Sequence, residues 1–164
     1  EAVNAASPSL PLARIPTCLW VFVAGFVCKE ISGLNSNADC YNNCIASGEG
    51  RTGSTWQGIM GYAREHSPRT MVLENVSRLK SSNESGRSNL DECMNDLRSA
   101  GYRAVALECS PEEWGFPITR HRIYIIASLL LTDRQLASIP ALMQSRKRSR
   151  SDMMPLGAFL HPDE

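Results

Sequence analysis

The sequence predicts an α/β domain whose mixed sheet closes with an antiparallel pair of strands. Short apolar, β-branched runs alternate with segments in which apolar residues recur at helical spacing. The last two strand-like runs are joined by a turn with no room for an α-helix, which favours antiparallel pairing. The chain has 164 residues, enough for one domain with a substantial core and short for a two-domain enzyme.

The N-terminal third begins without regular structure and then enters the sheet. Residues 1–17 are rich in Ala, Ser and Pro and have no apolar period, which indicates a loose lead-in. Residues 19–24 form a continuous apolar run that ends at Gly25, a pattern typical of a strand buried on both faces. Residues 33–53 are dense in Asn, Ser and Gly, so we expect a long exposed loop there.

The remaining elements follow from periodicity and from residues that end helices. Apolar residues at helical spacing predict a helix that starts near Thr55 and ends before Pro68, and residues 69–73 form a second buried strand. Further along, the patterns predict a helix at 90–100 with Gly101 as its C-terminal cap, strands at 102–109 and 122–128, and a helix at 132–144.

Composition limits the class of protein. Lys plus Arg and Asp plus Glu number 17 each, so any contact with a nucleic acid must come from a local surface. The longest apolar runs fall short of the roughly 20 residues that cross a bilayer. Six cysteines at irregular spacing indicate reduced thiols in an intracellular protein, and the basic residues at 146–150 are compatible with nuclear import.

Two side chains that could take part in catalysis lie at the ends of two predicted strands. Cys28 comes shortly after the first strand, and Glu74 lies at the end of the second. In open α/β sheets, reacting groups gather at the carboxyl ends of the strands. We therefore expect a thiol and a carboxylate on the same rim of the sheet.

Three short motifs lie on these segments. Residues 25–32 read Gly-Phe-Val-Cys-Lys-Glu-Ile-Ser, residues 68–76 read Pro-Arg-Thr-Met-Val-Leu-Glu-Asn-Val, and residues 115–122 read Gly-Phe-Pro-Ile-Thr-Arg-His-Arg. In order and spacing they resemble the Gly-x-Pro-Cys-x-x-Phe-Ser loop, the Glu-Asn-Val element and the Gly-x-Pro, Gln-x-Arg-x-Arg segment of C5-cytosine methyltransferases. Each motif alone is weak, whereas the ordered set is specific, so residues 19–127 resemble the catalytic half of such an enzyme.

The resemblance implies a partial Rossmann-like fold of the S-adenosylmethionine-dependent methyltransferases, and it assigns roles to individual residues. Cys28 takes the position of the thiol that adds to carbon 6 of a cytosine flipped out of DNA, and Glu74 that of its partner carboxylate. One of Arg120 and Arg122 would bind the base and the other would steady the carboxylate, with Arg122 expected at the base. The resemblance also places Val27, Thr55 and Trp56 near the cofactor S-adenosylmethionine. It places Ser32, Asn75 and Val76 near the substrate.

The chain departs from the family pattern at three positions. Val27 replaces a proline, Ile31 a phenylalanine and Ile118 a glutamine, and nothing before Cys18 resembles the family's Phe-x-Gly-x-Gly cofactor turn. We therefore expect a catalytic half at 18–145, followed by a basic, Pro-containing tail at 146–164. A transfer-RNA cytosine methyltransferase and a catalytically inactive binding module remain open alternatives.

Overall fold

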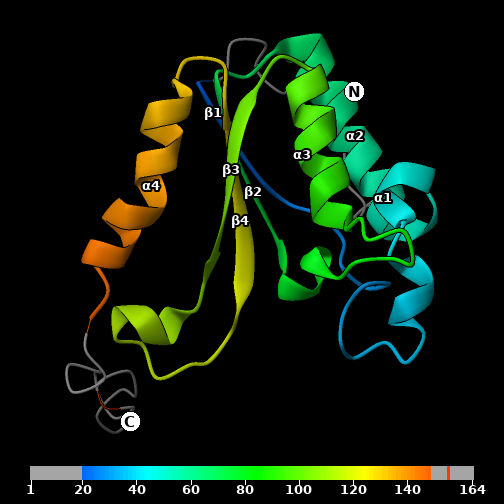
Figure 1. Ribbon diagram of the computed structural model, residues 1–164, viewed down its shortest axis with the longest axis horizontal. Coiled ribbons are helices and arrows are strands. Elements are labelled where there is room, and N and C mark those ends of the chain that lie inside the picture. The colour runs from blue at the N-terminus through cyan, green and yellow to red at the C-terminus, as the bar shows by residue number, and fades with distance from the viewer. Residues whose placement is uncertain (1–19, 149–154, 156–164) are drawn as a thin grey trace, which may run out of the picture.

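The computed structural model describes residues 20–148 and Pro155, and Figure 1 shows the arrangement of its elements. In chain order they are β1 (Val21–Gly25), η1 (Ala38–Tyr41), α1 (Cys44–Ser47), α2 (Gly50–His66), β2 (Thr70–Val76), η2 (Ser77–Lys80), α3 (Asn89–Ser99), β3 (Arg103–Cys109), η3 (Pro111–Trp114), β4 (Arg122–Ser128) and α4 (Asp133–Ser145). The predicted lead-in at 1–17 and most of the predicted tail, 149–154 and 156–164, lie outside the described residues.

The four strands form one mixed sheet in the order β1-β2-β4-β3. β1 pairs with β2 in parallel, whereas β4 pairs antiparallel with both β2 and β3. The predicted pairing of the last two strands is therefore confirmed, and β4 also inserts between β3 and β2. Figure 1 shows α4 on one side of this sheet and α2 and α3 on the other, which gives the three-layer α/β architecture of a Rossmann-like fold.

The core lies between the sheet and the layer of α2 and α3. Alternate residues of the central strands, such as Leu73 on β2 and Ile125 on β4, are buried against this layer. Trp56 and Met60 fill it from α2, and Leu97 fills it from α3. The helical spacing noted in the sequence thus marks the faces of α2 and α3 that cover the sheet.

The prediction that the first strand is buried on both faces is wrong. Among the described residues β1 pairs only with β2, so it forms an edge of the sheet. Val21 and Val23 are 53% and 71% exposed, whereas Phe22 packs on the core from the opposite face. The apolar run correctly indicated a strand, but no described helix or strand covers the outer face of β1.

The prediction of a long exposed loop at 33–53 is wrong from residue 38 onward. The segment contains η1 and α1, and α2 begins at Gly50 rather than near Thr55. Buried Asn89 fastens this segment to α3, because its side chain accepts a hydrogen bond from Ile45 N and donates one to Tyr41 O. These tertiary bonds outweigh the local preference of Asn, Ser and Gly for turns.

The helices of the C-terminal half begin and end close to the predicted positions. Ser88 and Asp91 form a capping box at the start of α3, and Gly101 follows that helix at φ 87°. Thr132 caps α4 in the same way through Gln135. Within the described residues, no helix combines the length and the apolar character that crossing a bilayer requires.

Candidate active site

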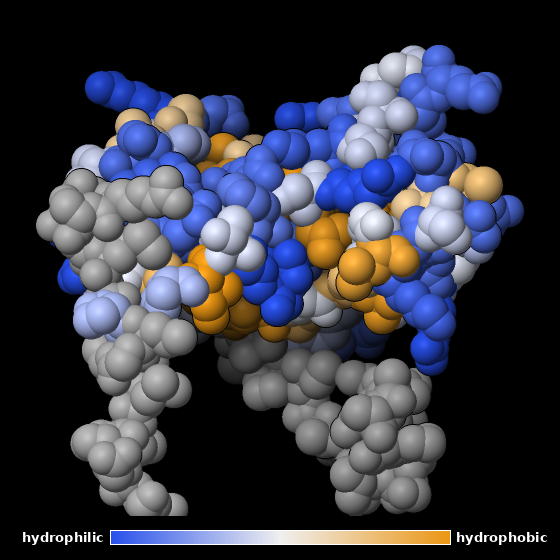
Figure 2. Space-filling view, turned by 90° about the horizontal axis from the view of Figure 1, so that it is seen from below, coloured by the Kyte–Doolittle hydropathy of each residue, from blue (hydrophilic) through white to orange (hydrophobic). Residues whose placement is uncertain are grey.

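The carboxyl ends of β1 and β2 form a rim, and the loop that carries Cys28 leaves β1 there. Because the two strands run in parallel, Gly25 lies opposite Glu74 in the register, with Cys28 three residues further along the chain. Phe26 N donates to Glu74 O over 3.4 Å, which continues the strand pairing into the loop. Figure 2 views the molecule from below, where the strands end in Figure 1, and shows hydrophobic groups interleaved with hydrophilic ones.

Glu74 and Arg122 form an ion pair at this rim. Arg122 Nε lies 2.8 Å from Glu74 Oε1. β4 brings the two together, since Val76 pairs with Arg122 and Glu74 pairs with Tyr124, which places both charged side chains on one face of the sheet. Gly25 gives the carboxylate room, because a Cβ there would lie only 3.2 Å from Glu74 Oε2. Both side chains are half-buried, so the charge–charge interaction between them is partly shielded from water.

Asn75 joins the thiol loop to β2 on the opposite face. Its buried side chain donates from Nδ2 to Phe26 O over 3.1 Å, and its Oδ1 accepts from Val76 N over 2.8 Å. Asn75 and Val76 were expected near the substrate. In the structure Asn75 holds the backbone immediately before Val27, which is a role in shaping the loop.

Glu30 is a residue at the site for which the sequence motifs predict no role. Its carboxylate accepts hydrogen bonds from Arg51 N, Thr52 N and Thr52 Oγ1 at the start of α2. Partial burial acts to raise the pKa of Glu30, but the bonds from Thr52 and Arg51 outweigh it and leave the pKa below its ordinary value. No local motif signals this contact, because Glu30 and its donors lie far apart in the sequence.

Ile31 and Ser32 complete the thiol loop. Ile31, in place of the family's phenylalanine, is fully buried in the core, so it packs beneath the loop despite the substitution. Cys28 is half-buried and also packs against the core. Ser32 Oγ accepts from Leu34 N, which places that hydroxyl in a local turn.

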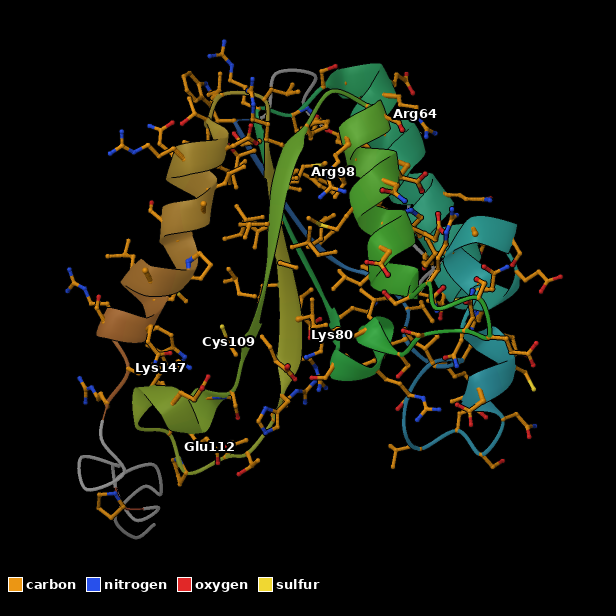
Figure 3. The ribbon with its side chains drawn as sticks, viewed as in Figure 1. Arg64, Lys80, Arg98, Cys109, Glu112 and Lys147 are labelled. Carbon is orange, nitrogen blue, oxygen red and sulfur yellow. The ribbon has the colours of Figure 1, made fainter. Side chains whose placement is uncertain are left out.

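The turn that carries Arg120 is held by a short relay of polar groups. Arg120 N donates to Ser110 Oγ over 3.0 Å, and Ser110 N donates to Glu113 Oε2 over 3.0 Å. Lys147, just beyond α4, forms an ion pair with the other oxygen of Glu113, and Figure 3 shows Lys147 beside η3. That hydrogen bond from Lys147 holds the pKa of Glu113 below its ordinary value.

The two arginines differ in what they contact. Arg122 was expected to bind the base, yet its guanidinium is engaged by Glu74 and by His121 O. Arg120 has an exposed side chain at the same rim. Arg122 is thus paired with the Glu74 carboxylate, and which of the two guanidiniums binds a base stays a prediction.

The residues expected at a cofactor offer unequal surfaces. Val27 is half-buried in the thiol loop and presents part of its side chain. Thr55 donates its hydroxyl to Arg51 O and Thr52 O inside α2. Trp56 is fully buried and donates from Nε1 to Asp96 Oδ2 over 2.7 Å, so its ring has no exposed surface. A cofactor contact at Val27, Thr55 or Trp56 stays a prediction.

The cysteines other than Cys28 do not form a metal site in the described part of the chain. Cys28, Cys40, Cys44, Cys93 and Cys109 are free thiols. No group of three or more His, Cys, Asp or Glu side chains there is arranged to hold a metal ion. Burial raises the pKa of Cys44 to about 11 and that of Cys93 well above its ordinary value, as expected for core thiols.

The fold and this rim define a methyltransferase-type α/β domain. Among solved structures, the chain is similar to the Entamoeba histolytica methyltransferase EhMeth, with a TM-score of 0.51 and 23% identity, over 70% of this chain and 33% of that chain. This likeness shows the fold alone.

The sequence comparisons give the family. The model of the C-5 cytosine-specific DNA methylase family matches residues 14–153, so the chain belongs to that family. It is 33% identical over 108 residues to Type II methyltransferase M.BbvI of Brevibacillus brevis, covering 64% of this chain and 26% of that protein. It is 25% identical over 117 residues to DNA (cytosine-5-)-methyltransferase DMT5 of Cryptococcus neoformans, covering 71% of this chain and 4% of that protein. The chain thus spans about a quarter or less of the length of these relatives.

Proposed function

We propose that this chain supplies the nucleophile and the base-binding groups of a DNA (cytosine-5-)-methyltransferase, which transfers a methyl group from S-adenosylmethionine to carbon 5 of cytosine. The observation that carries the proposal is the Glu74–Arg122 ion pair, 2.8 Å long, on the rim from which the Cys28 loop emerges. Membership of the family and the order of the three motifs support it.

The chain's own groups suit the covalent step. Carbon 5 of cytosine becomes nucleophilic when the Cys28 thiolate adds at carbon 6, because the π electron pair of the carbon 5–carbon 6 double bond moves onto carbon 5 and is delocalised to ring nitrogen 3. Glu74 accepts a hydrogen bond from the exocyclic amine and delivers a proton to ring nitrogen 3, where that charge accumulates. Arg122 holds the carboxylate in place, and Arg120 is the exposed guanidinium available to the 2-carbonyl oxygen.

The remaining steps restore the ring. S-adenosylmethionine supplies the methyl group to carbon 5, and Val27 would line one edge of its site. A base such as water then takes the carbon 5 proton, the electron pair of that C–H bond re-forms the carbon 5–carbon 6 double bond, and the carbon 6–sulfur bond breaks with its pair left on the Cys28 thiolate. Since the target carbon is stacked inside a duplex, the cytosine must be flipped outward to meet the rim.

Covalent trapping tests the proposal. The longest natural polypeptide that contains this chain should be incubated with S-adenosylmethionine and duplex DNA carrying 5-fluorocytosine, which has no carbon 5 proton to lose. The expected product is a protein–DNA adduct whose peptide mass locates the bond at Cys28. Cys28→Ala should abolish the adduct, and Cys40→Ser, a change at an exposed thiol, should leave it intact. No adduct from a protein that binds the cofactor contradicts the proposal.

A non-catalytic binding module is the second candidate, and Ile118 favours it. This side chain is 57% exposed at the position of the family's glutamine, so the turn presents an apolar group where the family has a polar one. Calorimetry measures whether the protein binds S-adenosylmethionine, and a methyl-transfer assay compares wild type with Cys28→Ala. Equal inactivity of the two proteins in that assay would support the binding module. Competition between duplex DNA and transfer RNA in the trapping reaction distinguishes a DNA enzyme from the transfer-RNA alternative.

A further inference from the structure

The Glu30 carboxylate binds the first turn of α2 through three hydrogen bonds. Oε1 accepts from Arg51 N over 3.0 Å, and Oε2 accepts from Thr52 N over 3.1 Å and from Thr52 Oγ1 over 2.6 Å. These amides belong to the first residues of a 17-residue helix, whose N–H groups have no partners within the helix. A negative charge at this end is also favoured by the helix dipole.

The helix start is shaped to receive a side chain from elsewhere in the chain. Glu49 occupies the N-cap position itself, but its side chain makes no capping hydrogen bond. Gly50 has φ +66°, and a Cβ there would lie 3.1 Å from Glu30 Cγ, so glycine permits the close approach of Glu30. Thr52 is fully buried, which fixes the hydroxyl that Glu30 contacts.

The same residue is part of the loop that carries the thiol. Glu30 lies two residues after Cys28, and its carbonyl oxygen accepts from Asn35 Nδ2 over 2.7 Å. Val27 precedes the thiol where a proline would preset φ, so the backbone of this loop has less intrinsic rigidity. Anchors after Cys28 therefore matter more here than in a loop stiffened by proline.

We propose that Glu30 is the positioning residue for Cys28: its carboxylate anchors the thiol loop to the N-terminus of α2 and holds the half-buried sulfur at the rim. The catalytic consequence rests on the proposed function, because it concerns the attack of Cys28 on the base. The effect on the thiol itself is a property of this chain and is measured without any substrate.

Site-resolved alkylation of the 164-residue chain tests the anchor. The chain is treated with iodoacetamide under native conditions, and each cysteine is followed by peptide mass spectrometry. Glu30→Gln should make Cys28 react about fivefold faster, as expected when a helix-capping interaction no longer opposes local opening. Exposed Cys40 serves as the reference thiol, and fully buried Cys93 reports any global unfolding.

Further variants separate anchoring from charge and from general instability. Glu30→Asp keeps the charge but falls short of α2, and Thr52→Val removes the hydroxyl donor, so both should also speed alkylation of Cys28. Glu49→Gln removes a carboxylate at the same end of α2 and should change nothing. An unchanged Cys28 rate in both Glu30 variants, acceleration in Glu30→Gln alone, or a parallel rise at Cys93 would each overturn the proposal.

The kinetic consequence is measured in the longest natural polypeptide with 5-fluorocytosine DNA. Glu30→Gln should lower the rate of adduct formation about fivefold or more while the Kd for DNA stays unchanged, since the anchor acts on the nucleophile rather than on binding. An unchanged trapping rate, or a weakened Kd that accounts for the loss, contradicts the positioning role. If wild type forms no adduct while the alkylation pattern appears, the proposed function fails and the anchor stands.

Discussion

Gly53 provides a sharp test of how α2 packs against α1. Alanine usually favours a helix interior over glycine by about 1 kcal/mol. At Gly53, however, a Cβ would overlap the carbonyl oxygen of Cys44 and the backbone of Gly48. Both are backbone atoms, so neither can rotate away. At Gly58 and Gly61, in the same helix, a Cβ would meet nothing within 4 Å.

Because of these contacts, the change in the free energy of unfolding on Gly→Ala substitution should have opposite signs at different positions of α2. Gly58→Ala and Gly61→Ala should each raise the free energy of unfolding by about 0.5–1 kcal/mol, because they restrict the unfolded chain without a clash. Gly53→Ala should lower it by about 1–3 kcal/mol, the usual cost of overpacking a tight contact. The three variants share the chemical change and the helix and differ in what the added methyl group meets.

Urea unfolding followed by circular dichroism measures all three variants, and the midpoints should fall on either side of wild type at an unchanged m-value. A stabilised Gly53→Ala would show that α1 and the start of α2 do not pack as described. The same result would weaken the Glu30 anchor, since that anchor uses the amides of this helix end.

Three further predictions concern side-chain contacts. Because the hydrogen bond from Lys147 holds the pKa of Glu113 below 4.5, its stabilisation is present above about pH 4.5 and is lost as the pH falls through the lower folded-state value. Lys147→Met should therefore lower the free energy of unfolding, measured by urea unfolding near pH 7, by about 1 kcal/mol or less. The same substitution should leave that free energy unchanged at a pH where Glu113 is protonated. Trp56→Phe should cost about 2–4 kcal/mol, and a double-mutant cycle with Asp96→Ala should return a coupling of about 1–2 kcal/mol; a coupling near zero would deny the bond. Burial raises the pKa of Cys44 to about 11, so at about pH 8 it should react with Ellman's reagent roughly 100-fold more slowly than an ordinary thiol, and a fast reaction would contradict its burial.

Much of the fold was accessible from local patterns. The helical spacing at 90–100 and Gly101 predicted α3 and its end, because amphipathic periodicity and a left-handed glycine act within a few residues. The prediction is wrong at β1, where the apolar run predicts a strand covered on both faces. Whether a strand lies at an edge depends on which other elements cover it, and that information is not in the strand itself.

The candidate site divides in the same way. The sequence by itself predicted the Cys28 thiol and the Glu74 carboxylate on one rim of the sheet, and its ordered motifs indicated the family that the comparisons show. Only the tertiary structure decided that β4 inserts beside β2, so that Arg122 meets Glu74, and that the Glu30 carboxylate reaches the start of α2. Periodicity reports which face of an element is buried, whereas a hydrogen bond between distant segments depends on how strands are ordered and on which donor a side chain can reach.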